Sequence, residues 1–383
     1  MDDRSGRDLI CFSHLRWDFV YQRPQHLMSR FAQSGRVFVI EEPIFHDGVA
    51  SLNVSERGEN LFIVVPHLTH GLEPERSEDL KREMLDQFLV DKDVQDYVLW
   101  YYTPMMLAWS GHLRPAAVIY DCMDQLSAFK DAPPELMLRE AELFAFADLV
   151  FTGGHSLYEA KKDHHPDVYA FPSSIDVPHF QQAIEITEEM LDQADIPHPR
   201  IGFVGVIDER LDIEMLGRMA ELKPEWRFVM IGPVVKIDEA SLPRPSNIHY
   251  LGSKSYDELP AYIAGWDVAM MPFALNDSTR YISPTKTPEY LAAGRPVVST
   301  PIRDVVQPYG ENGLVLIAST AEEFISAIEA SMDEDGFERR QKAAEFMSGL
   351  SWNRTHQAMS DLVDNAVAAN SKSRDIQRTS RAA

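Results

Sequence analysis

Residues 283–300, SPTKTPEYLAAGRPVVST, combine residue types at a spacing that suits an anionic ligand. Ser283 followed by proline favours a helix start and Gly294 a helix stop, so we predict one short helix here. Lys286 falls in the first turn, where a cation is unfavourable unless an anion joins it. Glu289 shares its face, so the pair offers a cation for phosphate and a carboxylate for a ribose diol. An exposed ion pair between the two is the alternative.

A second candidate site lies in residues 203–212, FVGVIDERLD. Gly205 ends an apolar run that we predict to be a strand, and a glycine there lets the backbone turn sharply towards a ligand. Arg210 follows and can bind phosphate through two nitrogens. Its alternative, which spacing alone supports equally, is an ion pair with a neighbouring acid, Asp208, Glu209 or Asp212. The spacing GxGxxG follows no predicted strand, so a dinucleotide site of the usual kind is not supported.

Length and composition restrict the class of protein. The 383 residues are 45% hydrophobic and 25% charged, which is typical of a globular chain with two domains. The net charge of -24 argues against a general nucleic-acid binder, because phosphate backbones are repelled. The segment 1–37 is mildly basic and leaves open a transient contact with a membrane surface.

Several further features indicate the compartment. We find neither a run of about 20 apolar residues nor an apolar signal region at the N-terminus. Cys11 and Cys122 lie far apart in apolar runs, as expected for core residues of a reduced protein. We predict a cytoplasmic protein, with peripheral contact at the inner face of the membrane left open.

The chain alternates short apolar runs with helix-length segments, which predicts βα units and mainly parallel sheets. The alternation restarts at the run IGFVGVI after a polar connection, so we place a domain boundary near residue 185. Two doubly wound α/β domains, 1–184 and 185–350, would leave a cleft where ligands bind. We predict a C-terminal helix over 351–370 that packs back on the first domain, and a flexible tail over 371–383.

Several segments of the sequence, taken in order, resemble a known enzyme family. The order IGFVGVIDER, WRFVMIGP, NIHYLGSKSYDELPAYIAGWDVAMMPF and SPTKTPEYLAAGRPVVST is similar to the nucleotide-sugar domain of glycosyltransferase family 4. The likeness is greatest to the bacterial branch acting in surface-polysaccharide synthesis. SHLRWDFVYQRPQHLMSRFA and VIYDCMDQLSAF agree more loosely, and the resemblance covers roughly residues 8–350. It implies the GT-B fold, in which two Rossmann-like doubly wound domains face each other across a cleft.

The resemblance also implies an activity. The first domain would bind the acceptor and the second a nucleoside diphosphate sugar, most simply a UDP-sugar. The sugar would pass to a saccharide or lipid-linked acceptor with retention of configuration, and without a metal or another cofactor. Two alternatives stay open, a nucleotide-sugar epimerase of the same fold and a nucleotide-sugar-binding protein that has lost catalysis.

Site residues are carried over position by position. Glu289 matches the second glutamate of the family's Glu-x7-Glu motif and would bind the ribose. Arg210 and Lys286 would hold the diphosphate and act with Asp121 in catalysis. The donor-binding residues would be Gly205, Arg210, Gly232, Gly252, Ser283, Thr285, Lys286 and Glu289. The acceptor side would contain Gln22, Arg23, Asp121 and Asp124, although the two aspartates are as well explained as caps of the following loop.

The sequence departs from the family at two positions. Tyr281 stands where the family has its first glutamate, which leaves Asp277 as a substitute carboxylate. Tyr120 stands where the family commonly has a histidine before an aspartate. Five first-domain aromatic residues could stack on an acceptor sugar, although core packing is favoured. They are Trp17, Tyr21, Trp100, Tyr101 and Tyr102.

Overall fold

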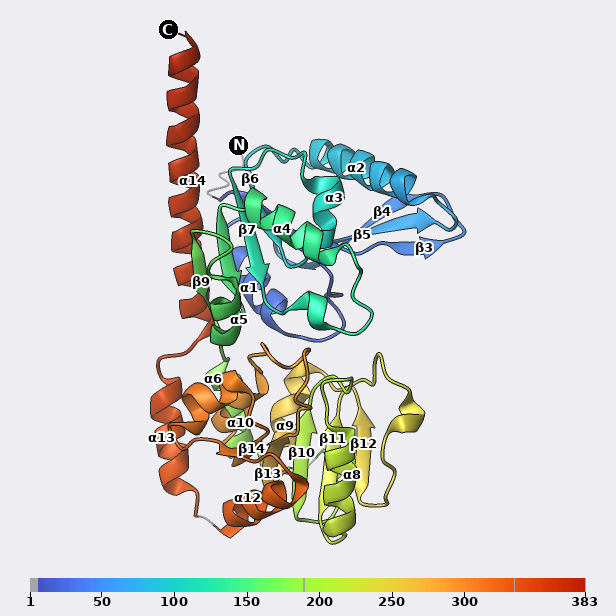
Figure 1. The fold of residues 1–383 in the computed structure, drawn as a ribbon, viewed down its shortest axis with the longest axis vertical. Helices are drawn as coiled ribbons and strands as arrows, with labels where there is room; N and C mark the ends of the chain where they lie inside the picture. Colours follow the sequence, from blue (N-terminus) through green and yellow to red (C-terminus); the bar gives the residue numbers. More distant parts are fainter. Residues whose placement is uncertain (1–5, 189, 334, 383) are drawn as a thin grey trace.

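The computed structural model describes residues 6–188, 190–333 and 335–382. Two sheets lie one above the other, each with helices on both faces, and the long last helix runs along the upper half (Figure 1). The first sheet is formed by residues 8–170 and the second by residues 200–317. The alternation of apolar runs and helical segments therefore produces two α/β units, one built on each sheet, as the sequence predicts.

The first sheet has nine strands in the order β3-β5-β2-β1-β6-β7-β8-β9, and β4 also pairs with β5. All its pairs are parallel except β4 with β5. The strands are β1 (Asp8–Ser13), β2 (Val37–Glu41), β3 (Ile44–His46), β4 (Ser51–Gly58), β5 (Leu61–Thr69), β6 (Tyr97–Tyr101), β7 (Ala117–Cys122), β8 (Leu149–Thr152) and β9 (Val168–Ala170).

Strand residues alternate between the two faces of this sheet, because successive side chains of a strand point in opposite directions. On β7, Tyr120 packs into the cluster with helices α2 (Pro74–Asp91), α3 (Leu107–Ser110) and α4 (Leu136–Phe146). Its neighbour Ile119 packs with α1 (Arg23–Phe31) and α14 (Trp352–Ala382). Trp100, Tyr101 and Tyr102 are buried in these two cores, which confirms the favoured core interpretation for them.

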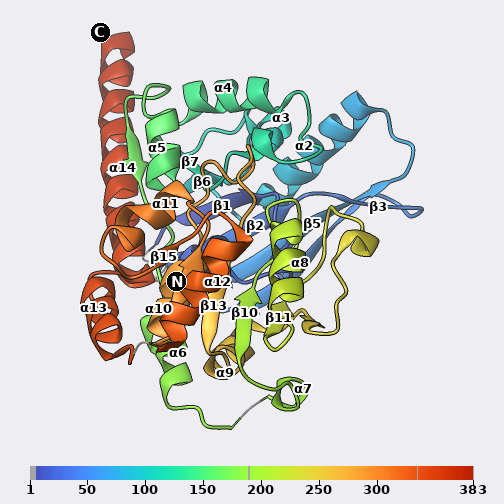
Figure 2. The same cartoon turned by 60° about the horizontal axis from the view of Figure 1, so that its bottom comes forward.

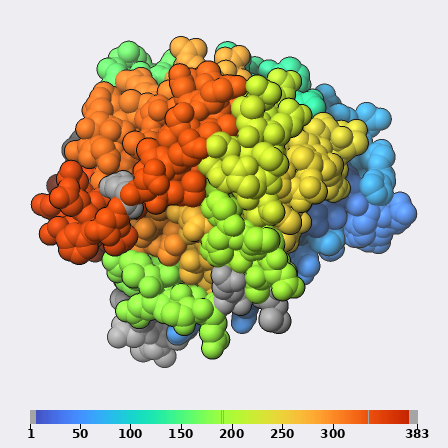
Figure 3. All heavy atoms as spheres, turned by 90° about the horizontal axis from the view of Figure 1, so that it is seen from below, coloured from blue at the N-terminus to red at the C-terminus, as the bar shows by residue number. Residues whose placement is uncertain are grey.

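The hairpin of β4 and β5, with β3 beside it, extends away from the first sheet (Figures 1 and 2). Seen from below, the same blue segment reaches past the outline of the second half (Figure 3). Strands β3 and β4 were not predicted. Strand β3 has only three residues, and β4 is mainly polar with no fully buried residue among those described, so the apolar signal is short in one and weak in the other.

The second sheet has the order β12-β11-β10-β13-β14-β15, and every pair is parallel. The order reverses beside β10, and ligands of such sheets bind at this point beyond the carboxyl ends of the strands. Gly205 directly follows β10. The strands are β10 (Arg200–Val204), β11 (Arg227–Ile231), β12 (Ile248–Gly252), β13 (Val268–Met271), β14 (Val297–Ser299) and β15 (Leu316–Ile317).

Two groups of helices cover the second sheet. One pairs α8 (Ile213–Leu222) with α12 (Ala321–Asp333). In the other, α10 (Lys286–Ala292) contacts α6 (Val177–Gln181) and α13 (Phe337–Met347). The remaining helices are α5 (His155–Lys161), α7 (Leu191–Ala194), α9 (Leu259–Ala264) and α11 (Arg303–Val305).

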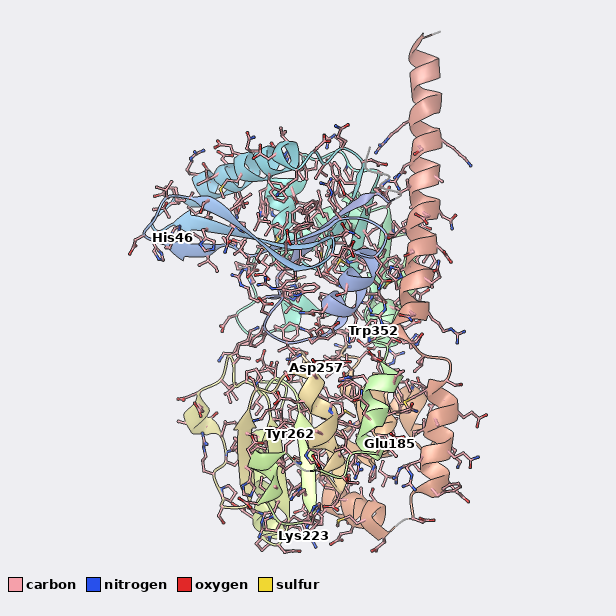
Figure 4. All side chains as sticks on the ribbon, turned by 180° about the vertical axis from the view of Figure 1, so that it is seen from behind. His46, Glu185, Lys223, Asp257, Tyr262 and Trp352 are labelled. Atoms are coloured by element: carbon pink, nitrogen blue, oxygen red, sulfur yellow. The ribbon has the colours of Figure 1, made fainter. Side chains whose placement is uncertain are left out.

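The chain crosses between the halves twice, before α6 and again at the start of α14 (Figure 1). Aromatic rings fill the space between these crossings. The His179 ring stacks on Tyr256 with ring centres 4.3 Å apart, and His26 stacks on Trp352 at 4.6 Å. Tyr21 joins them with its ring centre 4.6 Å from that of Tyr256. Figure 4 shows Trp352 at the junction of the two halves. We call these five residues the hinge cluster.

Helix α14 packs against the first sheet through Trp352, Met359, Val363 and Val367. It stays helical to Ala382, past the point where we predicted a flexible tail to begin. This segment contains neither glycine nor proline to stop the helix, so it continues the preceding turns. The Arg374 guanidinium also donates to the Pro115 carbonyl at 2.6 Å.

Two further findings concern the cysteines and the helices. Both cysteines, Cys11 and Cys122, are free and buried, as expected for core residues. None of the helices in the described ranges combines the length and the apolar character needed to cross a bilayer.

Candidate active site

A cavity of about 330 Å³ opens between the carboxyl ends of the two sheets. From the first half it receives the loop 17–21, which follows β1. From the second half it receives the turns after β10, β11 and β12. The lining includes Trp17, Phe19, Tyr21, Gly205, Gly232, Pro233, Lys254, Ser255 and Tyr256. Its place at the strand reversal makes it the candidate binding site.

Two predicted glycines allow the backbone of the second half to close tightly around this cavity. Gly232 has a φ of 140°, and a Cβ atom there would lie 1.9 Å from the Gly205 carbonyl oxygen. At Gly205 a Cβ would lie 2.8 Å from Cε of Lys286. Glycine at these two positions therefore brings three turns together and leaves room for the lysine side chain.

The structure places Lys286 at the first position of α10, one residue after the N-cap Thr285. The helix starts two residues later than the predicted start at Ser283, while Gly294 follows its end with a φ of 73°. Lys286 Nζ lies 3.4 Å from the Thr285 hydroxyl oxygen. Burial lowers the pKa of Lys286, and Arg210 lowers it further, whereas Glu289 raises it.

Glu289 lies one turn further along α10, and burial raises the pKa of its carboxyl group, while Lys286 and Thr285 lower it. Within the described ranges, no ion pair joins Glu289 to Lys286. The two side chains are therefore partly buried neighbours. The alternative interpretation, an exposed ion pair on the surface, is wrong. Helix α10 has only seven residues, so its N-terminus alone does not indicate an anion-binding site. The Lys286 side chain is what indicates that an anion binds here.

Arg210 forms the ion pair with Asp208 that the sequence left open as its alternative. Its Nε lies 3.0 and 3.1 Å from the two carboxylate oxygens, and Nη2 lies 2.6 Å from one of them. Asp208 is buried, whereas about a quarter of the Arg210 side chain is exposed. Pairing with Asp208 leaves the guanidinium partly accessible and holds one of its edges.

Asp124 follows β7 in the first half and faces the charges of the second half. Burial raises the pKa of its carboxyl group to about 6, while Arg210, Arg23 and Lys286 lower it and Asp208 raises it further. Asp124 therefore lies within electrostatic range of the two predicted diphosphate-binding cations. Its role on the acceptor side stays a prediction.

Arg23 and Asp121 do not face the cleft, which corrects the prediction for both. Arg23 Nη2 lies 2.7 Å from Asp121 Oδ1, and the side chains are 2% and 0% exposed. The remaining nitrogen, Nη1, donates to the Phe171 carbonyl at 2.7 Å. Asp121 points to the α1 face of β7, where Arg23 neutralises it, so neither charge is left for a phosphate or an acceptor.

Three other predicted residues lie around the site without a demonstrated role. Gln22 caps α1, and its backbone N–H donates to the Gln25 side chain at 3.0 Å. Ser283 lies where Gly154 of the first half approaches, since a Cβ on Gly154 would be 2.8 Å from its Cβ. Gly252 has a φ of 68°, and its carbonyl accepts from the Gly232 N–H at 2.9 Å.

The two tyrosines at the departures from the family pattern are both explained by packing. The Tyr120 hydroxyl donates to Glu140 at 2.8 Å, so this side chain points away from the cleft. Tyr281 packs against the first-half core, with Arg280 over its ring at 5.2 Å. Asp277, the substitute carboxylate, lies in a separate groove with Arg280 and Tyr281.

Comparison with known proteins adds to this geometry. Residues 198–334 match the family model described as "Glycosyl transferases group 1". Over 103 residues the chain is 35% identical to TuaH of Bacillus subtilis (strain 168), which is named as a glycosyltransferase of teichuronic acid biosynthesis. This alignment covers 26% of the chain and 26% of TuaH, so the chain spans about a quarter of the length of that relative.

Solved structures match almost the whole chain. Sucrose-phosphate synthase from Thermosynechococcus elongatus aligns with a TM-score of 0.71 and 14% identity, over 95% of this chain and 100% of that one. The chain has the GT-B fold. The structure described as "Trehalose-6-phosphate from E. coli bound with UDP-2-fluoro glucose" aligns at 0.69 and 11%, over 94% and 99%. HepE of Anabaena, in complex with UDP, aligns at 0.63 and 12%, over 94% and 100%.

The GT-B match confirms the predicted fold class. It shows the arrangement of the sheets, and it does not test the membership in glycosyltransferase family 4, which stays a prediction. Apart from Arg23 and Asp121, the assigned site residues stay predictions, as do the boundaries 1–184, 185–350, 351–370 and 371–383.

Residues that the sequence reasoning missed are mostly aromatic. Tyr256 lines the cavity, and its hydroxyl is buried without a hydrogen-bond partner in the described chain. Phe129 lies against Arg210, with 5.4 Å between the ring centre and the guanidinium carbon. Both follow predicted strands, but the sequence offers no signal that tells a cleft aromatic from a core aromatic.

Proposed function

We propose that this GT-B chain is a glycosyltransferase that moves a sugar from a nucleoside diphosphate sugar to a hydroxyl group. The observation that carries the proposal is that Lys286 lies beside Gly205 at the carboxyl edge of the second sheet, with Arg210 close enough to lower its pKa. The family match over residues 198–334 supports a glycosyltransferase, and neighbours of the same fold hold UDP or a UDP-sugar analogue. We therefore propose a UDP-sugar as the donor.

The chemistry follows from where negative charge develops. As the bond between the anomeric carbon and the diphosphate oxygen breaks, the leaving diphosphate gains charge. Fixed cations aimed at that oxygen stabilise this state more than they stabilise the bound donor. The acceptor oxygen forms the new bond to the anomeric carbon, and its proton passes to the departing phosphate oxygen. We propose retention of configuration, and charge neutralisation by Arg210 and Lys286 without a metal ion.

We further propose that the acceptor is a saccharide or a lipid-linked saccharide of bacterial surface-polysaccharide synthesis. The relative TuaH, whose name places it in teichuronic acid synthesis, supports this class of acceptor. We propose a cytoplasmic location, with transient contact at the membrane surface where a lipid-linked acceptor would lie.

Calorimetry of the full chain with UDP, and assays of UDP release from UDP-sugars with a panel of saccharide acceptors, test the proposal. We expect saturable UDP binding, UDP release that depends on an acceptor, and a glycoside product. A UDP-sugar isomer formed without glycoside would favour an epimerase. UDP binding without any turnover would favour a nucleotide-sugar-binding protein.

We expect Asp124 to make UDP binding pH-dependent. Its carboxyl group has a pKa raised to about 6 and faces Arg210, Arg23, Lys286 and Asp208. Below pH 6 it is protonated and does not repel the diphosphate, and above pH 6 it becomes negative. The affinity for UDP should therefore fall as the pH rises through 6, by about 1–2 kcal/mol at the separations of such a site.

Titration of UDP itself contributes to the same pH range, so a matched variant is needed. Asp124→Asn keeps the shape of the side chain and removes its charge. Calorimetry at pH 5 and pH 8 should show a smaller loss of affinity for Asp124→Asn than for the unaltered chain. Equal losses in the two proteins would mean that Asp124 does not face the diphosphate.

A further inference from the structure

The Arg210 guanidinium is held by groups from both halves of the molecule. Asp208 binds it along one edge, with Nη2 at 2.6 Å from a carboxylate oxygen. Phe129, from the loop after β7, presents its ring at 5.4 Å from the guanidinium carbon. Lys236 Nζ lies 5.2 Å from the centre of the same ring. A first-half ring therefore lies against two second-half cations.

Hydrogen bonds fix the loop that carries this ring. The Lys130 N–H donates to Glu209 Oε1 at 3.3 Å, and Lys130 Nζ lies 3.4 Å from the Lys236 carbonyl oxygen. Glu209 is the immediate neighbour of Arg210, so the loop rests directly on the turn that carries the guanidinium. These contacts exist only while the two halves are together.

Two side-chain nitrogens of Arg210 bind Asp208, and the third is available for a ligand. Nε and Nη2 both donate to Asp208. Among hydrogen bonds to the described residues, Nη1 makes none. The edge contact with Asp208 fixes the direction of the guanidinium, and the ring limits rotation of its plane. One nitrogen is thereby left free in a set orientation.

We propose that Phe129 is a positioning residue, which holds Arg210 across the cleft so that Nη1 is directed at the donor diphosphate when the two halves are closed. This inference rests on the proposed function. It assigns to the acceptor half a part in building the donor site. When the halves separate, Arg210 keeps Asp208 but loses the ring, and its guanidinium can rotate away from the phosphate.

A double-mutant cycle on UDP binding tests the coupling. Phe129→Leu removes the ring and keeps an apolar side chain, and Phe129→Tyr keeps the ring. We expect Phe129→Leu to weaken UDP binding by about 2- to 30-fold and Phe129→Tyr by less than about twofold. In the Arg210→Ala background, Phe129→Leu should have almost no further effect. Lys236→Ala removes the other cation from the ring and should leave UDP affinity within about twofold.

The outcomes separate the inference from the proposed function. Equal losses from Phe129→Leu with and without Arg210 would mean that the ring acts through packing alone, and would overturn the inference. The same holds if Phe129→Tyr binds as weakly as Phe129→Leu. Wild-type affinity in Arg210→Ala, or no UDP binding by the unaltered chain, would overturn the proposed donor site and the inference with it. Far-UV circular dichroism identifies a variant that fails to fold, and if Phe129→Leu fails, Phe129→Met, which also lacks the ring and keeps a long apolar side chain, takes its place in the cycle.

Discussion

Replacing Lys286 by alanine will lower the turnover of a UDP-sugar by about 30- to 1,000-fold, or roughly 2–4 kcal/mol of barrier. The side chain lies beside Gly205 at the carboxyl edge of the second sheet, where the diphosphate is proposed to bind. Burial already lowers its pKa, so a charged Lys286 is less solvated than a surface lysine and interacts more strongly with a developing charge. Single-turnover assays with a saturating UDP-sugar measure the effect on the chemical step.

A matched control is available in the same half. Lys223 pairs with Glu329 and lies at the far end of the second half from the cleft, as Figure 4 shows. Lys223→Ala should leave turnover within about twofold, because its charge is remote from the cleft and paired with Glu329. If Lys286→Ala folds and turns over like Lys223→Ala, the donor phosphate binds somewhere else.

Replacing Arg23 by methionine will destabilise the chain by about 3–5 kcal/mol, because Asp121 would remain charged and buried without its partner. The two side chains are 2% and 0% exposed, and Arg23 also satisfies the Phe171 carbonyl. The pair therefore connects α1, β7 and the segment after β9. Urea unfolding followed by far-UV circular dichroism measures the loss.

The double variant Arg23→Met with Asp121→Leu provides the control for this prediction. With both charges replaced by apolar side chains, most of the lost stability should return. The experiment also distinguishes the structural role of Asp121 from the catalytic role predicted for it. If Arg23→Met unfolds at the same urea concentration as the unaltered chain while turnover is lost, the pair acts in catalysis and not in stability.

The sequence was most informative where a feature depends on neighbouring residues. Runs rich in Val, Ile and Phe predicted most of the buried strands, because such strands are apolar on both faces. The position of Gly294 gave the end of α10, and the closeness of Lys286 and Glu289 followed from helical spacing. The start of α10 was missed because Thr285, and not Ser283, takes the N-cap position.

Features that depend on distant residues were not predictable in this way. Arg23 and Asp121 are separated by 98 positions, and nothing near either one indicates that they neutralise each other. The same applies to Phe129, whose partner Arg210 belongs to the other half. Strands β3 and β4 escaped prediction because β4 lies at the border of its sheet, where burial does not select apolar residues.

The hinge cluster has a mechanical consequence. Two chain crossings, one leading into α6 and one into α14, pass between the halves beside the same group of stacked rings. A single connection would let the halves rotate relative to each other about many axes. Two connections restrict this rotation to the axis that passes through both of them. Motion about any other axis would stretch a connection or pull Tyr21 of the first half away from Tyr256 of the second half. The two halves should therefore open and close by rotation about a single hinge axis at this cluster, and the cleft should close along the same path each time.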